Sequence, residues 1–228
     1  MNGEFDLVVL VADADMEWVM RTLLEKRADS LRIRPLRFDV RRHPGRDPGV
    51  YREAHSFLRF FLGKARYALV LVDREGSGQE HRLTAEEMEV ELEARLRQNG
   101  WAHRRGRPRA AAIVLDPELE VWVWSPSPHV AQVLGVTQAQ LQQVRDTFAA
   151  RTDGKPERPK EALYEALRLG RRPQSARIFQ ELAERVSLDT HERAFDRLRS
   201  TLQGWFPSRN SGAEEETDEE ERASLLGA

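Results

Sequence analysis

The chain has 228 residues, of which 40% are hydrophobic and 32% are charged, and it contains no cysteine. This composition can supply a hydrophobic core and excludes a chain that is disordered throughout. The absence of cysteine excludes disulfide bonds, thiolate metal sites and cysteine nucleophiles. The length fits one large domain, or one domain with a small appendage.

The sequence predicts a soluble protein of the cytoplasm. Its first residues, MNGEFDLVVLVADAD, combine an acidic start with a short apolar run, which is unlike a signal peptide. No apolar run approaches the roughly 20 residues that cross a bilayer, so we expect no membrane partner. The lack of cysteine fits a reducing compartment. The oligomeric state is left open.

Short apolar runs in the first half of the chain predict a sheet. Phe5–Ala12, Tyr67–Val72 and Ala110–Leu115 are almost wholly apolar, which is typical of strands that are buried on both faces. Leu31–Val40 alternates apolar and basic residues, and Pro35 within it indicates an edge strand or a break. Helical spacing separates these runs, so we expect an α/β fold with a mostly parallel sheet flanked by helices.

Helices are predicted both between the strands and beyond them. The predicted helices are Asp13–Lys26, Tyr51–Leu62, Thr84–Gln98, His129–Leu134, Gln138–Ala150, Lys160–Leu169, Gln174–Val186 and His191–Gly204. The pattern predicts an α/β domain over residues 1–126 and a helical extension packed on it over residues 127–206. Residues 207–228 form an acidic tail that we expect to be disordered.

Charge is unevenly distributed along the chain. The net charge is −2, but the segment from Ser208 onward holds seven acids and two bases, which leaves +3 on the residues before it. The positive charge clusters in two arginine groups, which are Arg32, Arg34, Arg37, Arg41, Arg42 and Arg46, and Arg104, Arg105, Arg107 and Arg109. Arg46, Arg104 and Arg105 are the candidates for contacts with nucleic-acid phosphate. Solvated surface is the alternative interpretation.

Acidic residues follow three of the apolar strands. The first strand ends at Asp13, the next at Asp73 and the last at Asp116. Ligands of open α/β sheets bind at the carboxyl ends of the strands, and gathered carboxylates favour a cation such as Mg²⁺ or Mn²⁺. In an extended segment, Asp73 and Glu75 would point to the same side. Each acid alone is also compatible with a helix cap or a turn.

Other catalytic signatures are absent from the sequence. It has no GxxxxGK[ST] phosphate loop, no GxGxxG, no HExxH and no GxSxG. Its six histidines show no ligand spacing.

These features resemble the TOPRIM fold, the metal-binding domain of topoisomerases, primases and overcoming-lysogenization-defect nucleases. In that family an acid follows the first strand and an Asp-x-Asp pair follows a later one. Asp13 and Glu17 match the first element, and Asp73-Arg74-Glu75 matches the second with Glu in place of the second Asp. Glu120 and Trp122 match the Pro-x-x-Glu-x-Trp stretch of small TOPRIM-like proteins from bacterial defence islands, above all the small component of methylation-associated defence systems.

The resemblance implies a metal-dependent nuclease that takes part in antiphage defence. Mg²⁺ or Mn²⁺ would bind Asp73 and Glu75 together with Asp13, and Glu120 would share a second cation. Glu17 would act as general base, and Lys160 would contact the scissile phosphate. The partners would be DNA or RNA and other subunits of the defence system.

Two other functions stay open. Ala12–Asp15 stands where the family carries Glu-Gly, whose glycine lets the backbone approach a phosphate. The chain is therefore also compatible with a catalytically degenerate TOPRIM module that serves as a sensor or assembly subunit of a defence complex. The third candidate is a nucleic-acid-binding adaptor that uses only the arginine clusters.

Overall fold

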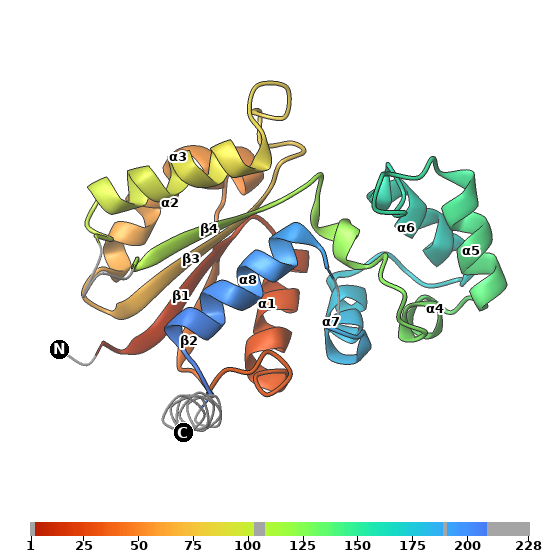
Figure 1. The fold of residues 1–228 in the computed structure, drawn as a ribbon, viewed down its shortest axis with the longest axis horizontal. Coiled ribbons are helices and arrows are strands. Elements are labelled where there is room, and N and C mark those ends of the chain that lie inside the picture. Colours follow the sequence, from red (N-terminus) through yellow and green to blue (C-terminus); the bar gives the residue numbers. More distant parts are fainter. Residues whose placement is uncertain (1–2, 103–107, 189–190, 209–228) are drawn as a thin grey trace, which may run out of the picture.

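The computed structural model describes residues 3–102, 108–188 and 191–208. These residues form a four-stranded, all-parallel sheet that is flanked by helices and followed by a helical extension (Figure 1). The predicted fold class is confirmed, and the arrangement is consistent with a TOPRIM-like fold. Arg104, Arg105 and most of the predicted acidic tail lie outside the described residues.

The sheet has the strand order β2-β1-β3-β4. Its strands are β1 (Phe5–Val11), β2 (Phe38–Arg42), β3 (Ala65–Asp73) and β4 (Ala110–Leu115). The two central strands, β1 and β3, are almost wholly buried, as their apolar sequences predicted. The register aligns the carboxyl ends of β3 and β4, because Asp73 lies opposite Leu115.

The edge strand β2 starts later than the alternating pattern predicted. The expected strand was Leu31–Val40, whereas the structure pairs only Phe38–Arg42 with β1. Pro35 cannot donate to a strand ladder, and the segment before Phe38 is instead held by the side chain of Asp6. That carboxylate accepts a hydrogen bond from the backbone N–H of Arg37 at 3.0 Å. The predicted edge position is confirmed.

Helices cover both faces of the sheet (Figure 1). α2 (Arg46–Leu58) and α3 (Ala85–Gln98) lie on one face, and α1 (Ala14–Lys26) and α8 (Arg193–Trp205) lie on the other. α2 begins five residues before the predicted Tyr51, because Pro48 is tolerated in the first turn of a helix.

The remaining helices lie beyond β4. They are α4 (His129–Leu134), α5 (Gln138–Thr147), α6 (Pro159–Leu169) and α7 (Ala176–Arg185), with short 3₁₀ turns η1 (Arg59–Phe61) and η2 (Leu119–Trp122) in the chain before them. Within the described residues, no helix combines the length and the apolar character that crossing a membrane requires.

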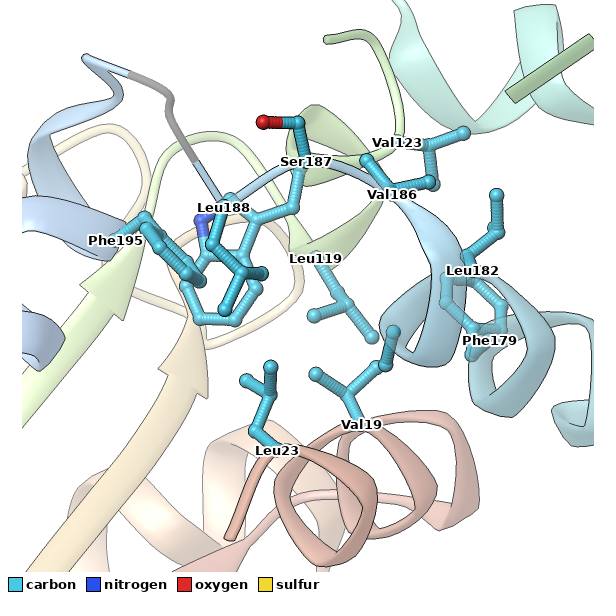
Figure 2. Close-up of a pocket in the computed structure, with 12 residues that line it drawn as sticks. Val19, Leu23, Leu119, Val123, Phe179, Leu182, Val186, Ser187, Leu188 and Phe195 are labelled. Atoms are coloured by element: carbon cyan, nitrogen blue, oxygen red, sulfur yellow. The ribbon is translucent and has the colours of Figure 1, made fainter. Parts of the chain in front are cut away.

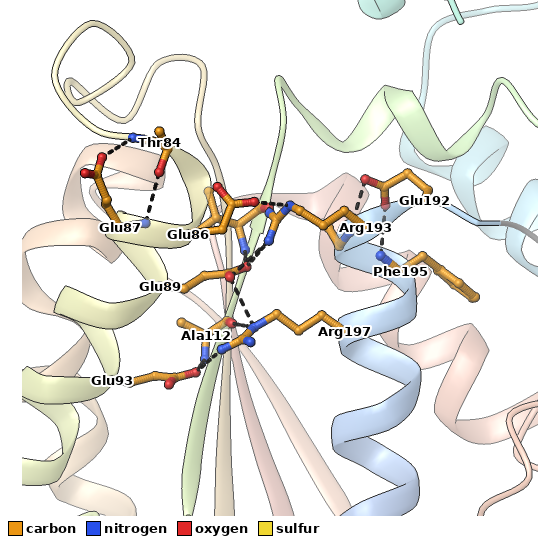
Figure 3. Close-up of polar contacts among 12 residues, drawn as sticks. Thr84, Glu86, Glu87, Glu89, Glu93, Ala112, Glu192, Arg193, Phe195 and Arg197 are labelled. Atoms are coloured by element: carbon orange, nitrogen blue, oxygen red, sulfur yellow. Dashed lines mark hydrogen bonds and ion pairs between the residues drawn. The ribbon is translucent and has the colours of Figure 1, made fainter. Parts of the chain in front are cut away.

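Glutamates of α3 cap the free edge of β4 (Figure 3). The backbone N–H of Val114 donates to Oε1 of Glu89 at 2.9 Å, and the N–H of Ala112 donates to Oε1 of Glu93 at 3.0 Å. Side-chain carboxylates thus take the place of a further strand, which satisfies backbone donors that would otherwise remain open at the edge.

Arginines of α8 complete this edge from the opposite side. Nε of Arg197 donates to the carbonyl oxygen of Ala112 at 3.0 Å, and Arg193 donates to the carbonyl oxygen of Val114. Both guanidinium groups also pair with Glu89, at 3.2 Å from Arg197 and 3.0 Å from Arg193 (Figure 3). This network attaches α8, the last helix of the chain, to β4 and α3.

Candidate functional site

Three buried carboxylates meet at the carboxyl end of the sheet. One oxygen from each of Asp73, Glu118 and Glu120 lies within 4.8 Å of the other two. Their exposed fractions are 6%, 7% and 3%. This end of an open α/β sheet is where ligands bind, and a group of three carboxylates there can hold a divalent metal ion.

The local sequence explains how these side chains converge. β3 runs without interruption into Asp73, whose side chain therefore lies at the sheet end. After β4 the chain enters η2, in which Leu119 packs into the core on one side and Glu120 is carried on the other. Figure 2 shows Leu119 and Val123 lining a small apolar cavity of about 60 Å³ together with Val19 of α1. Leu119 and Val123 also belong to the hydrophobic core, so apolar packing fixes this segment.

Asp73 is buried among other carboxylates and, in the described part of the chain, has an unpaired oxygen atom. Its Oδ1 is buried and has no hydrogen-bond partner among the described residues. Burial, reinforced by the negative charges of Asp47 and Glu120, raises the pKa of Asp73 well above its usual value. A buried polar atom without a partner is costly, and a bound cation would remove that cost. The all-carboxylate donor set therefore fits a hard divalent ion.

More carboxylates surround the cluster. Oδ1 of Asp47, in the first turn of α2, accepts a hydrogen bond of 2.8 Å from the backbone N–H of Asp73. Asp13 caps α1, with its Oδ1 accepting from the N–H of Met16 at 3.0 Å. Burial raises the pKa of Asp47 to about 6, and burial together with the charge of Asp13 raises that of Asp15 to about 6. The ends of β1, β3 and η2 and the start of α2 thus share one region of negative potential.

Lys160 provides a positive charge at the cluster. Its Nζ lies 3.1 Å from Oε2 of Glu118 and 3.4 Å from Oε1 of Glu120. Burial acts to lower the pKa of Lys160, but the charges of Glu120 and Glu118 outweigh burial and raise it. Burial and the charge of Glu118 in turn raise the pKa of Glu120 to about 7. One ammonium group does not balance the surrounding carboxylates, which leaves negative charge available to a cation.

An open basin of about 840 Å³ adjoins the cluster. Residues from the ends of β1 and β2, the first turns of α1 and α2, and α6 line it, and these include Asp13, Asp15, Glu17, Arg21, Arg41, Arg42, His43, Arg46, Lys160 and Tyr164. Acidic side chains come from the N-cap and the first turn of α1, whereas three of the arginines come from β2 and α2. Lys160 belongs to both the basin and the cluster, so the two features are contiguous.

Of the six predicted catalytic and metal-binding residues, four lie at this site, Glu17 lines the adjoining basin, and Glu75 does neither. Asp13, Asp73, Glu120 and Lys160 lie at this site. Glu75 stands in an exposed turn and is not part of the carboxylate group, because the extended backbone ends at Asp73. The prediction that Asp73 and Glu75 point to the same side assumed an extended chain over both residues. That assumption is wrong, because the chain turns after Asp73.

Glu17 lines the basin but is engaged in ion pairs. Its Oε1 lies 2.9 Å from Nε of Arg21, and its Oε2 lies 2.9 Å from Nε of Arg42. Both carboxylate oxygens are thus occupied. Its observed contacts fix the position of Arg42 at the wall of the basin.

Arg46 has the placement expected of a phosphate-binding residue. It is exposed, it lines the basin and it has a positive φ of 49° as the first residue of α2. No ion pair of its guanidinium group is found within residues 3–102, 108–188 and 191–208. The preceding turn is held by His43, whose Nδ1 accepts from the N–H of Gly45 at 3.0 Å.

Sequence reasoning missed two carboxylates of the site, Glu118 and Asp47. Glu118 lies two residues before Glu120 and has an extended backbone immediately before η2. Asp47 lies in a segment that reads as a turn. The signal that would have found it is topological, since a helix that follows a parallel strand starts at the same edge of the sheet as the strand ends.

Comparison with protein-family models, with curated proteins and with solved structures finds no match to this chain.

Proposed function

We propose that this protein is a Mg²⁺- or Mn²⁺-dependent phosphodiesterase that cleaves nucleic acid as a component of bacterial antiphage defence. The observation that carries the proposal is the buried carboxylate group of Asp73, Glu118 and Glu120, in which Oδ1 of Asp73 has no partner among the described residues. Oxygen-only ligands favour Mg²⁺ and Mn²⁺ over softer metals. The defence role is supported by the resemblance of residues 116–122 to small TOPRIM-like proteins.

Asp73, Glu118 and Glu120 would hold the cation, with Asp13 beside them. When bound, a divalent cation stabilises the negative charge that develops on a phosphodiester during hydrolysis. The low exposure of the three carboxylates keeps bulk water away from them, which strengthens their electrostatic interactions.

Positively charged side chains would orient the polyanionic substrate. The ammonium group of Lys160 lies between the carboxylates and the basin, where a point charge can contact the reacting phosphate. Arg41, Arg42 and Arg46 line the basin and would hold the neighbouring phosphates.

Asp15 is better suited than Glu17 to accept a proton from the attacking water. It lines the basin and its pKa is about 6, close to the value that suits a general base at neutral pH. Both oxygens of Glu17 are in ion pairs with Arg21 and Arg42. We therefore assign the base to Asp15 and assign to Glu17 the positioning of Arg42.

A cleavage assay on labelled single- and double-stranded DNA and RNA tests the function. We expect cleavage with Mg²⁺ or Mn²⁺, none with EDTA, and a loss of about 100-fold or more in Asp73→Asn. Glu75→Gln is the matched control and should cleave like the wild type. Asp15→Asn should lose activity, whereas Glu17→Gln should mainly weaken substrate binding.

The alternative functions predict different results in the same assay. A degenerate module would show no cleavage by the wild type with any of these substrates. An adaptor would bind nucleic acid with an affinity that falls with salt and does not respond to Asp73→Asn. Either result would contradict the proposed activity.

A further inference from the structure

The ring of Tyr164 forms part of the wall of the basin. Tyr164 is 39% exposed and belongs to α6, four residues after Lys160. Residues spaced by four lie on the same face of a helix, roughly 6 Å apart along its axis. Tyr164 is therefore one helical turn from Lys160, whose ammonium group contacts the carboxylate cluster.

The surroundings of Tyr164 place it beside the reactive groups. Partial burial raises the pKa of its hydroxyl, and the charges of Lys160, Glu120 and Asp15 also act on it. Across the described part of the chain, its hydroxyl makes no hydrogen bond and its ring stacks on no other aromatic ring. The structure thus gives this ring no internal partner that accounts for its position.

The side chains that line the basin suit a single strand of nucleic acid. Arg41, Arg42 and Arg46 give part of the basin wall a positive charge, and the exposed ring of Tyr164 belongs to the same basin, whose acidic side chains lie at the start of α1. This combination is typical of sites that follow the backbone with basic residues and stack bases on aromatic side chains. The volume of about 840 Å³ lies within the usual range of ligand-binding pockets.

We propose that Tyr164 stacks on a base of a single-stranded nucleic acid, next to the phosphate that Lys160 contacts. This inference rests on the proposed function and names its substrate class. The carboxylates are only 3–7% exposed, so the reacting phosphate must enter a recess. An unpaired strand can enter such a recess and offers the free face of a base, whereas the bases of a duplex are stacked on one another.

Phe60 provides a matched control on another part of the surface. It is 69% exposed, lies in η1 before the start of β3, and has Nζ of Lys64 at 3.5 Å from its ring centroid. It therefore combines an aromatic ring with a lysine, as Tyr164 does, but at the amino end of the strands. If binding depended only on the amount of exposed aromatic surface, substituting Phe60 would weaken it as much as substituting Tyr164.

Binding of short fluorescent single-stranded DNA and RNA, measured by anisotropy in EDTA, tests the inference. Tyr164→Ala should weaken binding by about 5- to 100-fold. Tyr164→Phe, which keeps the ring, should bind within about twofold of the wild type, and so should Phe60→Ala. Wild-type affinity in Tyr164→Ala, or no binding of single strands by the wild type, would overturn the inference.

The same binding measurement with an abasic strand and with a duplex distinguishes base stacking from backbone contact and single strands from duplex. The loss caused by Tyr164→Ala should vanish on an oligonucleotide that lacks bases, because only the sugar-phosphate backbone remains. An equal loss on the abasic strand would show a backbone contact and overturn stacking. Tighter binding of duplex than of single strand by the wild type would overturn the substrate class.

Failure of the inference can be distinguished from failure of the proposed function. Binding in EDTA does not depend on catalysis, so a Tyr164-dependent affinity without any cleavage would uphold stacking and refute the nuclease. Metal-dependent cleavage with the same KM in Tyr164→Ala and the wild type would uphold the nuclease and refute stacking.

Discussion

Nζ of Lys160 lies 3.1 Å from Oε2 of Glu118, and the backbone N–H of Lys160 donates to Oε1 of the same carboxylate at 3.2 Å. The first turn of α6 is thereby attached to the segment after β4, and the ammonium group serves as a counter-charge for the cluster. A divalent cation that bound Glu118 and Glu120 would compete with this ammonium for the same oxygens. Because Lys160 also lines the basin, its position should depend on whether Glu118 and Glu120 hold a cation.

Lys160→Met removes this counter-charge and should destabilise the metal-free protein. Glu118 is buried, but the lysine side chain is 40% exposed, and solvent weakens the ion pair. We therefore expect the free energy of unfolding in urea to fall by only about 1–2 kcal/mol. The apparent affinity for Mn²⁺ should rise, because the competitor is gone. Lys26→Met, which breaks the surface pair with Glu184, is the control and should cost less than about 1 kcal/mol. Weaker Mn²⁺ binding in Lys160→Met would contradict this account.

Asp73→Asn should stabilise the protein when metal is absent. The substitution keeps the size of the side chain and removes a charge that is buried near other carboxylates. We expect a higher Tm than the wild type in EDTA at pH 8, and no further increase when Mg²⁺ is added. The wild type should gain stability from Mg²⁺, because a ligand that binds the folded state stabilises it. A lower Tm of the variant in EDTA would show that Asp73 has a structural partner.

Metal-free stability should fall as pH rises from about 4 to about 7. The pKa values of Asp15 and Asp47 rise from 3.8 to about 6 on folding, and that of Glu120 rises from 4.5 to about 7. Within this range the folded state binds more protons than the unfolded state, so the free energy of unfolding decreases with pH. We expect a decrease of at least about 1.4 kcal/mol, which corresponds to one pKa unit.

Urea titrations at several pH values in EDTA measure this dependence. Asp47→Asn keeps the acceptor for the N–H of Asp73 and removes the charge, so its curve should be flatter than that of the wild type. Above the highest of these pKa values the decrease should level off. Asp6, Glu161 and Glu184 have lowered pKa values and act in the opposite direction, so the comparison with Asp47→Asn isolates the raised groups. A curve of the same slope in Asp47→Asn and the wild type would contradict this account.

The capped edge of β4 predicts a large structural effect far from the carboxylate cluster. Glu89 is buried, accepts from the N–H of Val114 and pairs with Arg193 and Arg197. Glu89→Leu leaves all three donors without this partner and should cost about 3–5 kcal/mol in urea unfolding. Glu86→Ala, which removes an exposed partner of Arg193, should cost less than about 1 kcal/mol. Similar losses in the two variants would contradict the proposed role of the edge network.

The apolar strands made the sheet predictable, whereas the paths after them did not. β1, β3 and β4 were predicted because they consist of continuous apolar residues that are buried on both faces. The acids at their ends followed from the rule that parallel strands share one edge. Asp13 and Asp73 were identified in this way, whereas Glu120 was identified through the TOPRIM-like resemblance, and the structure places the three together.

The turns of the chain after the strands determine which other acids lie beside Asp13, Asp73 and Glu120. Glu75 was expected beside Asp73 because an extended chain repeats its direction every two residues, but the chain turns immediately after Asp73. Glu118 entered the cluster because an extended residue precedes η2. Asp47 lies beside it because α2 begins at Arg46, five residues before the helix start that the sequence predicted. Propensity rules do not determine such turns, since tertiary packing sets them.

Calorimetric titration of Mn²⁺ into the wild type, Asp73→Asn and Glu75→Gln tests the central claim most directly. If Asp73, Glu118 and Glu120 form the metal centre, the wild type and Glu75→Gln will bind alike and Asp73→Asn will lose binding while remaining folded. Binding that is lost in Glu75→Gln, or absent from the wild type, would contradict the metal centre that this structure supports.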